Sequence, residues 1–283
     1  MSQVALSAGI RDTLLTIQRT TRSATMSEQR LATGLKVNSA IDNPLAFFTA
    51  AGLRDRSNDL AGLQDSMQQA TRTIAAANSG IEGMKKLFET AQGLANQAAA
   101  EQDGAVRNTL QTQFNEIIRQ VDDLMRNSGY GGVNLLNGGT LNVRFDGNDT
   151  TASLALTVNS GTVLNAATLG VTTGAVGSWS NADTVSTAGN VAINNALTSI
   201  RTAITTLRSE ASRLGANNAI ITTRQEFTEN MINTLRAGSD DWTLADLNEE
   251  GAKLTSLNTR NQIAQTALAL ASQRDQSVLR LFG

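Results

Sequence analysis

Apolar residues recur at a fixed interval along the stretch from Leu53 to Ala98, which carries the most regular hydrophobic pattern in the chain. One series repeats every seven residues and consists of Leu53, Leu60, Met67, Ile74, Ile81, Phe88 and Ala95, and an interleaved series consists of Leu63, Ala70, Ala77, Met84, Ala91 and Ala98. A sustained heptad repeat predicts one helix, on the order of 70 Å long at about 1.5 Å per residue, that supercoils left-handedly against neighbouring helices. The many alanines predict that these neighbours approach closely.

Another apolar stripe precedes this helix and a further one follows it. Over Ile10–Leu35 the apolar or small positions alternate in steps of four and three, which is the pattern of a coiled-coil seam. The stripe ends before Pro44, which disfavours a helical conformation of Asn43, so the pair predicts an N-cap and the first residue of a new helix. After a predicted loop at 101–105, the same rhythm at 110–124 predicts a helix that folds back antiparallel.

The next part of the chain has turn-forming and alternating sequences. The stretch NSGYGGVNLLNGG at 127–139 is rich in turn residues. Leu141–Phe145 and Ser153–Val158 are alternating and β-branched and flank a polar connection, which predicts a β-hairpin. The segment 161–189 is rich in Thr, Ser, Gly, Ala and Asn with little periodicity, and it predicts a small exposed cap of turns and short strands.

Helical periodicity returns over Ile193–Leu235, and the sequence AGSDD at 237–241 predicts a break before a last helix. The final stretch, 262–283, places apolar residues on more than one helical face. Ordering a backbone residue costs about 1–2 kcal/mol, and burying a large apolar side chain contributes roughly 1.5–3 kcal/mol. We therefore expect this tail to require packing partners.

The predicted fold class is mainly α, with a long coiled-coil helical rod built from both chain termini and a small β-hairpin or irregular cap from the middle of the chain. Three parts are expected. Terminal helices occupy 1–43 and 242–283, a helical rod domain occupies 44–139 and 190–241, and an exposed hairpin and turn-rich region occupies 140–189.

Composition removes most catalytic chemistry and most electrostatic partners. The 283-residue chain has no cysteine and no histidine, which excludes disulfides, thiol nucleophiles, imidazole bases and zinc ligation by sulfur or imidazole. With a formal net charge of −2 and no basic stripe, nothing indicates nucleic acid or an anionic membrane as a partner. The Gly-rich 129–139 lacks the lysine of a P-loop, so no cofactor is expected. The N-terminal sequence has no signal-peptide pattern and no stretch is apolar enough for a membrane span.

Two further features have ordinary structural explanations. The acidic pairs Asp122–Asp123, Asp240–Asp241 and Glu249–Glu250 could in principle do acid-base work. Adjacent residues on a helix point about 100° apart, however, so these pairs are interpreted as solvated surface. Asn148 begins an N-glycosylation sequon on an expected turn, but a single match in a chain rich in Asn, Ser and Thr has low specificity.

Three short sequences resemble the bacterial flagellins and stand in the order that this family has. RLATGLKVNSAIDNP at 30–44 is similar to the family's joint after its first helix, SGYGGVNLLNGG at 128–139 to the turn after its rod helices, and the ending SVLRLFG to its usual C-terminus. The pair Asn43–Pro44 departs from the acidic and small residues that are usual at that joint. In this detail the chain is also similar to the hook-filament junction protein, a relative with the same terminal helices.

The resemblance implies a non-enzymatic structural subunit that self-assembles into the extracellular helical flagellar filament used for swimming. The terminal helices would form the inner tube, the rod an outer tube, and the hairpin region would face solvent. Implied partners are further copies of the chain, the flagellar type III export apparatus, a secretion chaperone, the filament cap and the hook-junction proteins, and export would leave no cleaved signal peptide. Inter-subunit packing is expected at apolar residues of the terminal helices, namely Ile10, Leu14, Ile17, Leu31, Leu35, Leu254, Leu257, Ile263, Leu268, Val278, Leu279 and Phe282.

One feature of many flagellins is missing. The host innate flagellin receptor grips an Arg-x-Arg-Glu-Leu-Ala stretch on the rod helix of such proteins, and the matching stretch here reads TAQGLA at 90–95. Thr90 and Gln92 stand where the family has its two arginines. Since neither residue supplies the charge-assisted hydrogen bonds of an arginine, we expect this protein to be a poor agonist of that receptor.

Three alternatives remain open at this point. A hook-filament junction protein would form a single ring without elongating. A secreted coiled-coil adhesin would bind through residues 141–189 and keep its function without the chain ends. A helical-bundle enzyme would need a nucleophile, base or metal ligands in one pocket, and the sequence displays no such group.

Overall fold

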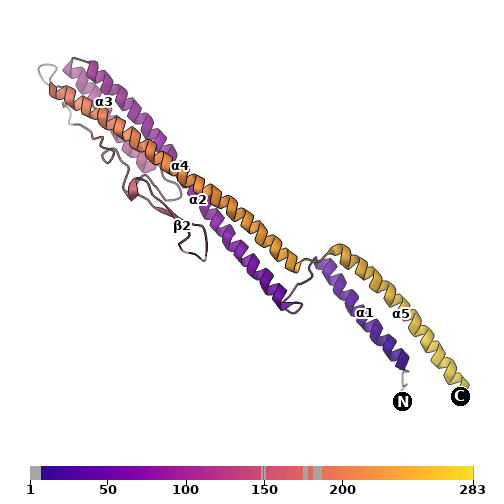
Figure 1. Ribbon diagram of the computed structural model, residues 1–283. Coiled ribbons are helices and arrows are strands. Elements are labelled where there is room, and N and C mark those ends of the chain that lie inside the picture. Colours follow the sequence, from indigo (N-terminus) through magenta and orange to yellow (C-terminus); the bar gives the residue numbers. More distant parts are fainter. Residues whose placement is uncertain (1–7, 148, 150, 175–177, 181–186, 283) are drawn as a thin grey trace. The chain divides into compact units, whose positions relative to one another are not determined.

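The computed structural model describes residues 8–147, 149, 151–174, 178–180 and 187–282. Over these residues the chain forms five α-helices, one short 3₁₀ helix and one hairpin (Figure 1). The elements are α1 (Ala8–Thr33), α2 (Pro44–Ala100), α3 (Gly104–Asn127), β1 (Leu141–Arg144), β2 (Ser153–Leu156), the short 3₁₀ helix η1 (Asn159–Gly161), α4 (Thr187–Thr243) and α5 (Leu247–Phe282). The prediction of a mainly α fold with a small hairpin is confirmed.

The chain divides into two compact units, and the boundaries fall inside the two longest helices. One unit contains the residues up to Ser57 and those from Asn233 onward, and the other contains Asn58–Ile232. The helices α2 and α4, of 57 residues each, therefore contribute to both units. The three-part division expected from the sequence places its boundaries elsewhere and stays a prediction.

Side-chain caps determine where the helices begin. The backbone N–H of Ala46 donates to Asn43 Oδ1 at 3.1 Å, and α2 starts at Pro44, so the predicted N-cap is confirmed. The helix α3 begins at Gly104, where Asp103 Oδ1 accepts from the Ala105 N–H at 2.7 Å. Only residues 101–103 separate α2 from α3, inside the predicted loop.

The heptad residues of α2 form the core of the second unit together with α3 and α4. Met67, Ile74, Met84 and Phe88 are among its buried side chains, and α4 contributes apolar residues in the same cluster. A Cβ placed on Gly80 would lie 2.3 Å from Ser128 Oγ, and one on Gly83 would lie 2.5 Å from Leu124 Cδ2. Contacts between 80–83 and 124–128, across a loop at 101–103, show that α3 runs antiparallel to α2 at the close approach that the alanines predicted.

The hairpin and the turn before it close one side of this core. The strands β1 and β2 are antiparallel, with Leu141 opposite Leu156 and Val143 opposite Leu154. In the preceding turn, the side-chain amide of Asn134 donates to the carbonyls of Met125 and Arg126 at the end of α3, at 2.8 and 2.9 Å. The turn is thereby tied to the helix that it follows.

The segment after the hairpin differs from the expected exposed cap of turns and short strands. Its described residues contain turns and one isolated bridge, Asn137 to Val163, instead of further strands. Five of its apolar residues are buried in the core: Leu164, Ala166, Leu169, Val171 and Trp179. Trp179 packs on Phe114 of α3 with ring centroids 5.0 Å apart, and Gln111 Nε2 donates to Ser178 Oγ at 2.6 Å. Irregularly spaced apolar residues give no periodic signal, so their burial was not predicted.

The expected helix break at 237–241 is wrong. The helix α4 continues through this sequence to Thr243, and the break falls at 244–246. Gly238 faces α2, since a Cβ on it would lie 3.5 Å from Leu53 Cδ1, and the neighbouring Ser239 is fully buried. The packing of Gly238 against α2 and the burial of Ser239 outweigh the low helix propensity of this sequence.

Candidate functional site

The two ends of the chain pack on each other within the first unit, because α5 lies along α1. The described apolar residues expected to make inter-subunit contacts are mostly only partly covered there. Ile10 is 8% exposed, whereas Leu14 is 40% and Ile263 64% exposed. Intermediate exposure is found for Ile17, Leu31, Leu35, Leu254, Leu257 and Leu268. The side chains of Val278, Leu279 and Phe282 lie outside the described residues.

A short crossing of two extended segments joins these helices to the rest of the unit. The backbone N–H of Lys36 donates to the Thr243 carbonyl at 2.7 Å, and the Ala245 N–H donates to the Gly34 carbonyl at 3.0 Å. Gly34 ends α1 with a φ of +72°, a left-handed conformation that glycine adopts at no steric cost. Arg54 of α2 donates to Thr243 Oγ1 at 3.0 Å. Main-chain bonds thus link residues more than 200 positions apart.

The carboxylate of Glu250 ties α5 to α1. Ser27 Oγ donates to Glu250 Oε2 at 2.7 Å, and Arg30 Nη1 donates to Glu250 Oε1 at 2.7 Å. Lys253 Nζ lies 3.9 Å from the same Oε1. The hydrogen bonds from Ser27 and Arg30 hold the pKa of the Glu250 carboxyl below its ordinary value, because they favour the charged form.

Glu250 was not identified from the sequence, where its pair with Glu249 was interpreted as solvated surface. That interpretation is wrong for Glu250, which is 7% exposed, although Glu249 is exposed. Both acids stand in the first turn of α5, where negative charge is favourable in any case. The sequence therefore carried no signal that distinguished the buried Glu250 from the exposed Glu249.

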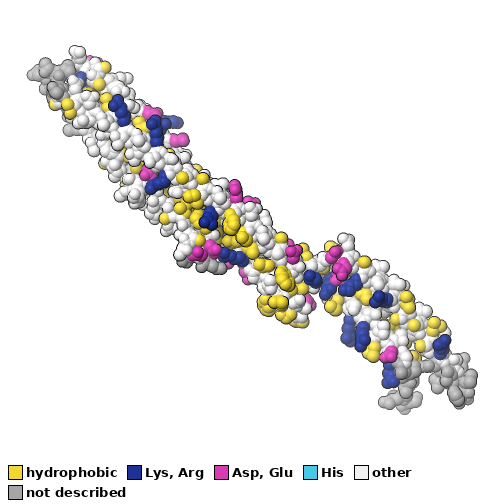
Figure 2. All heavy atoms as spheres, in the orientation of Figure 1, with side chains coloured by type: hydrophobic (Ala, Val, Ile, Leu, Met, Phe, Trp, Pro, Cys, Tyr) yellow, Lys and Arg dark blue, Asp and Glu magenta, His cyan; other side chains and the backbone are white. Residues whose placement is uncertain are grey.

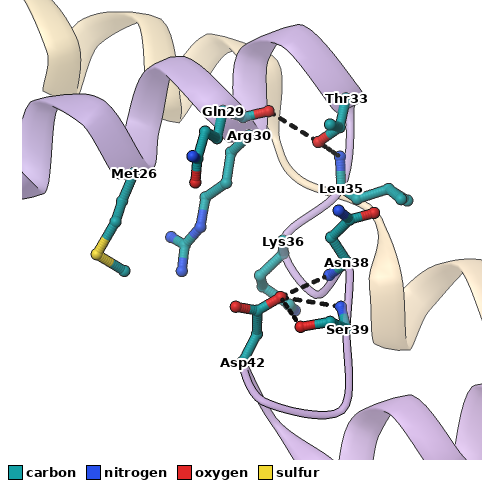
Figure 3. Close-up of a pocket in the computed structure, with 9 residues that line it drawn as sticks. All are labelled: Met26, Gln29, Arg30, Thr33, Leu35, Lys36, Asn38, Ser39 and Asp42. Atoms are coloured by element: carbon teal, nitrogen blue, oxygen red, sulfur yellow. Dashed lines mark hydrogen bonds between the residues drawn. The ribbon is translucent and has the colours of Figure 1, made fainter.

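A polar hollow of about 480 Å³ lies beside the crossing (Figure 3). It is lined by Met26, Gln29, Arg30, Thr33, Leu35, Lys36, Asn38, Ser39 and Asp42. Asp42 Oδ2 accepts from the N–H groups of Ser39 and Asn38, at 2.9 and 3.1 Å, and from Ser39 Oγ at 3.1 Å. These bonds, the Ser39 N–H first, lower the pKa of Asp42, so its carboxylate holds the turn in shape. The hydroxyl of Ser39 shares this carboxylate with two backbone N–H groups, so the pair belongs to the hydrogen bonding of the turn.

Other tests for chemistry among the described residues are negative. No group of three or more acidic residues that could hold a metal ion is present in the described part of the chain. Over the same residues, no helix combines the length and the apolar character that crossing a membrane requires. The exposed apolar side chains of α1 and α5, such as Leu14 and Ile263, are surfaces available for packing.

The three remaining predicted positions lie elsewhere. Thr90 is exposed and Gln92 partly exposed on α2. Asn148, the sequon residue, lies outside the described residues.

Comparison with known proteins identifies the family to which this chain belongs. Residues 10–140 match the family model of the bacterial flagellin N-terminal helical region, and residues 197–282 match that of the bacterial flagellin C-terminal helical region. The chain belongs to the bacterial flagellin family. As a flagellin it is a structural subunit of the flagellar filament, which favours that prediction over the junction protein, the adhesin and the enzyme.

Full-length flagellins are among its relatives. Flagellin FljK of Caulobacter vibrioides is 28% identical over 100% of this chain and 99% of its own length. The flagellin of Brucella melitensis is 25% identical with the same coverage of both chains, 100% and 99%. The crystal structure of Bacillus cereus flagellin superposes with a TM-score of 0.45 and 15% identity, covering 58% of this chain and 88% of that one.

Proposed function

We propose that this flagellin assembles through the apolar side chains that remain uncovered on α1 and α5, with neighbouring copies of the chain supplying the cover. Ile263 and Leu270 of α5 are 64% and 58% exposed although α1 packs along the same helix. This exposure is the observation that carries the proposal. Burying each such side chain contributes roughly 1.5–3 kcal/mol, so a few of them per copy drive association.

The geometry of assembly follows from the kind of contact. When different surfaces of successive copies meet head to tail and the rotation does not close, an open helical filament results. The paired ends of the chain present such surfaces because α1 and α5 each expose apolar residues that differ in sequence and spacing. We assign the inner part of the filament to residues 1–43 and 242–283, the surrounding tube to 44–139 and 190–241, and the solvent-facing part to 140–189.

The finer features implied by the family belong to the same proposal. The chain acts without enzymatic activity, leaves the cell through the flagellar type III export apparatus with no cleaved signal peptide, and meets a secretion chaperone, the filament cap and the hook-junction proteins on the way. The absence of cysteine suits export in an unfolded state, because no disulfide would have to be broken.

Hydrogen exchange tests the proposal directly. In the monomer, amides of α5 are expected to exchange readily because α5 packs on α1 along one face only. In filaments the exchange of the same amides should become slower by at least about 100-fold, since local opening of α5 then also breaks contacts with neighbouring copies. Amides beside Ile118, which is already buried in the monomer, serve as the control and should change little. Equal exchange of α5 in monomer and filament would contradict the proposed role of the chain ends.

A further inference from the structure

The turn before the hairpin contains the only Asn-Gly pair of the sequence, Asn137–Gly138. Asn137 is exposed. Within the described part of the chain, no hydrogen bond holds its side-chain amide, and none of normal geometry holds the Gly138 N–H. The carboxamide carbon of Asn137 and the backbone nitrogen that follows it are therefore free to approach each other.

The fold requires a glycine at the second position of this pair. Gly138 has a φ of +76°, a conformation that residues with a side chain rarely adopt. A Cβ at this position would also lie only 3.1 Å from the Gly161 carbonyl oxygen. The turn thus keeps a residue without a side chain directly after Asn137, and the missing Cβ leaves the backbone nitrogen of Gly138 sterically open.

The structure restrains the comparable pairs elsewhere in the chain. The sequence has four Asn-Ser pairs, at 38–39, 78–79, 127–128 and 159–160. In the first three the serine N–H already donates a hydrogen bond, to Asp42, within the helix α2 and to the Met125 carbonyl. In the fourth, the side-chain amide of Asn159 donates to the Val163 carbonyl at 3.4 Å. Asn137 differs from all four because neither reacting group is held.

We propose that Asn137 is a site of spontaneous deamidation, independent of filament assembly and with water as the only co-reactant. The Gly138 nitrogen bonds to the Asn137 carboxamide carbon, its proton passes to the leaving nitrogen, and ammonia departs, which closes a five-membered cyclic imide. Water then opens the imide. Breaking the bond to the side-chain carbonyl gives aspartate at position 137, and breaking the main-chain bond gives isoaspartate, whose backbone runs through the former side chain. Because the attacking nitrogen must lose its proton, the rate rises with pH.

The isoaspartate form loosens the turn. The Asn137 N–H donates to Asn134 Oδ1 at 3.1 Å, and the carbonyl of the buried Leu136 accepts from the Leu164 N–H at 2.8 Å. One extra backbone carbon directly after these bonds changes the direction in which the chain leaves them. The added charge alone has little effect, since Figure 2 shows basic and acidic side chains together around the hairpin and exposed charges interact weakly.

Mass spectrometry of aged protein tests the modification. The full chain is incubated in mildly alkaline buffer, digested and mapped, and isoaspartate is quantified by methyl transfer from an isoaspartyl methyltransferase. Conversion at Asn137 should be at least about 10-fold faster than at any Asn-Ser pair, because each of those pairs must first break a hydrogen bond. Asn137→Gln should remove the signal, since its longer side chain would have to close a larger ring. Conversion at Asn137 in urea but not in the folded chain overturns the proposal, as does a rate no faster than that of the Asn-Ser pairs.

Hydrogen exchange tests the effect on the turn. The modified fraction is separated from the unmodified chain by its added negative charge, and the Leu164 amide should exchange at least about 10-fold faster in it, because local opening breaks fewer contacts. The matched control is Asn137→Asp, which adds the same charge on a normal backbone and should exchange at the unmodified rate. Equal exchange in all three proteins overturns the proposed loosening of the turn.

Discussion

At the scale of single residues, Glu250 is the side chain on which the joining of the two chain ends depends most clearly. It is buried and accepts hydrogen bonds from Ser27 and Arg30 of α1. When the charged group of a buried hydrogen-bonded set is replaced, its donors lose their charged acceptor, at a cost of about 1–3 kcal/mol. We therefore predict that Glu250→Gln lowers the free energy of opening of α5, measured by native-state hydrogen exchange at pH 7, by about this amount.

The pH dependence of that difference follows from the lowered pKa of Glu250. When the folded-state pKa lies below the unfolded value of about 4.3, the stabilisation is fully present above that value and is lost as the pH falls through the folded-state pKa. The difference between the chain and Glu250→Gln should thus shrink below about pH 4. Glu249→Gln removes the same charge from an exposed neighbour and should have little effect at either pH. A difference that persists unchanged in acid would contradict the assignment.

Sequence patterns predicted some of these residues and not others. Asn43 was recognised as a cap because the pair with Pro44 has a local chemical meaning that does not depend on the fold. Glu250 was not recognised, because its partners on α1 are about 220 positions away in the chain and only the folded structure brings them together.

At the scale of whole elements, the close packing of α2 on α3 depends on glycines as well as on the heptad alanines. A Cβ on Gly80 would lie 2.3 Å from Ser128 Oγ and 2.7 Å from Leu136 Cδ1, so Gly80→Ala forces a shift of the turn against the helix. We predict a loss of stability of about 1–3 kcal/mol, measured from the urea denaturation midpoint.

The matched control for that substitution stands on the same helix. Gly62 of α2 has open space around the position of a Cβ, so Gly62→Ala should stabilise the protein by about 0.5–1 kcal/mol through helix propensity alone. If both substitutions changed stability in the same direction, the close approach of α2 and α3 would not be the cause.

The exposed surface of α2 carries a separate prediction about recognition by the host. Thr90 is exposed and Gln92 partly so, and neither can replace the arginine that many flagellins have there. Each charge-assisted hydrogen bond contributes about 1.5–3 kcal/mol, so we predict activation of the innate flagellin receptor on the order of 100-fold weaker than by a flagellin with both arginines. Reporter cells treated with purified monomer measure this, with Thr90→Arg, Gln92→Arg as the variant expected to gain activity. Potent activation by the unsubstituted monomer would refute the prediction.

The helices and strands were predictable where a regular hydrophobic repeat continued over the whole element. The helices α1, α2 and α3 and the hairpin follow the patterns that predicted them. The end of α4 does not, because the packing of Gly238 against α2 and the burial of Ser239 keep a sequence of low helix propensity helical. Burial of Trp179 and its neighbours was also missed, since apolar residues spaced irregularly in a turn-rich segment produce no period.

At the scale of the whole molecule, apolar surface stays exposed on the unit that contains both chain ends. The second unit has a continuous buried core, whereas α1 and α5 of the first expose several large apolar side chains. The sequence predicted this imbalance from the apolar tail, because ordering such a segment requires packing partners. The sequence did not show which of the residues that pack on this tail belong to the same chain. In the structure α1 supplies such residues, and we assign the remainder to neighbouring copies.

Seeded polymerisation followed by electron microscopy tests this account most directly, by comparing the full chain with a chain that ends at Asn261. The two proteins should share the core of the second unit, which circular dichroism can verify, because no residue of that unit is removed. We predict that the full chain grows long filaments from seeds and that the shortened chain does not. Equal growth of the two chains would contradict the role assigned to the C-terminal helix.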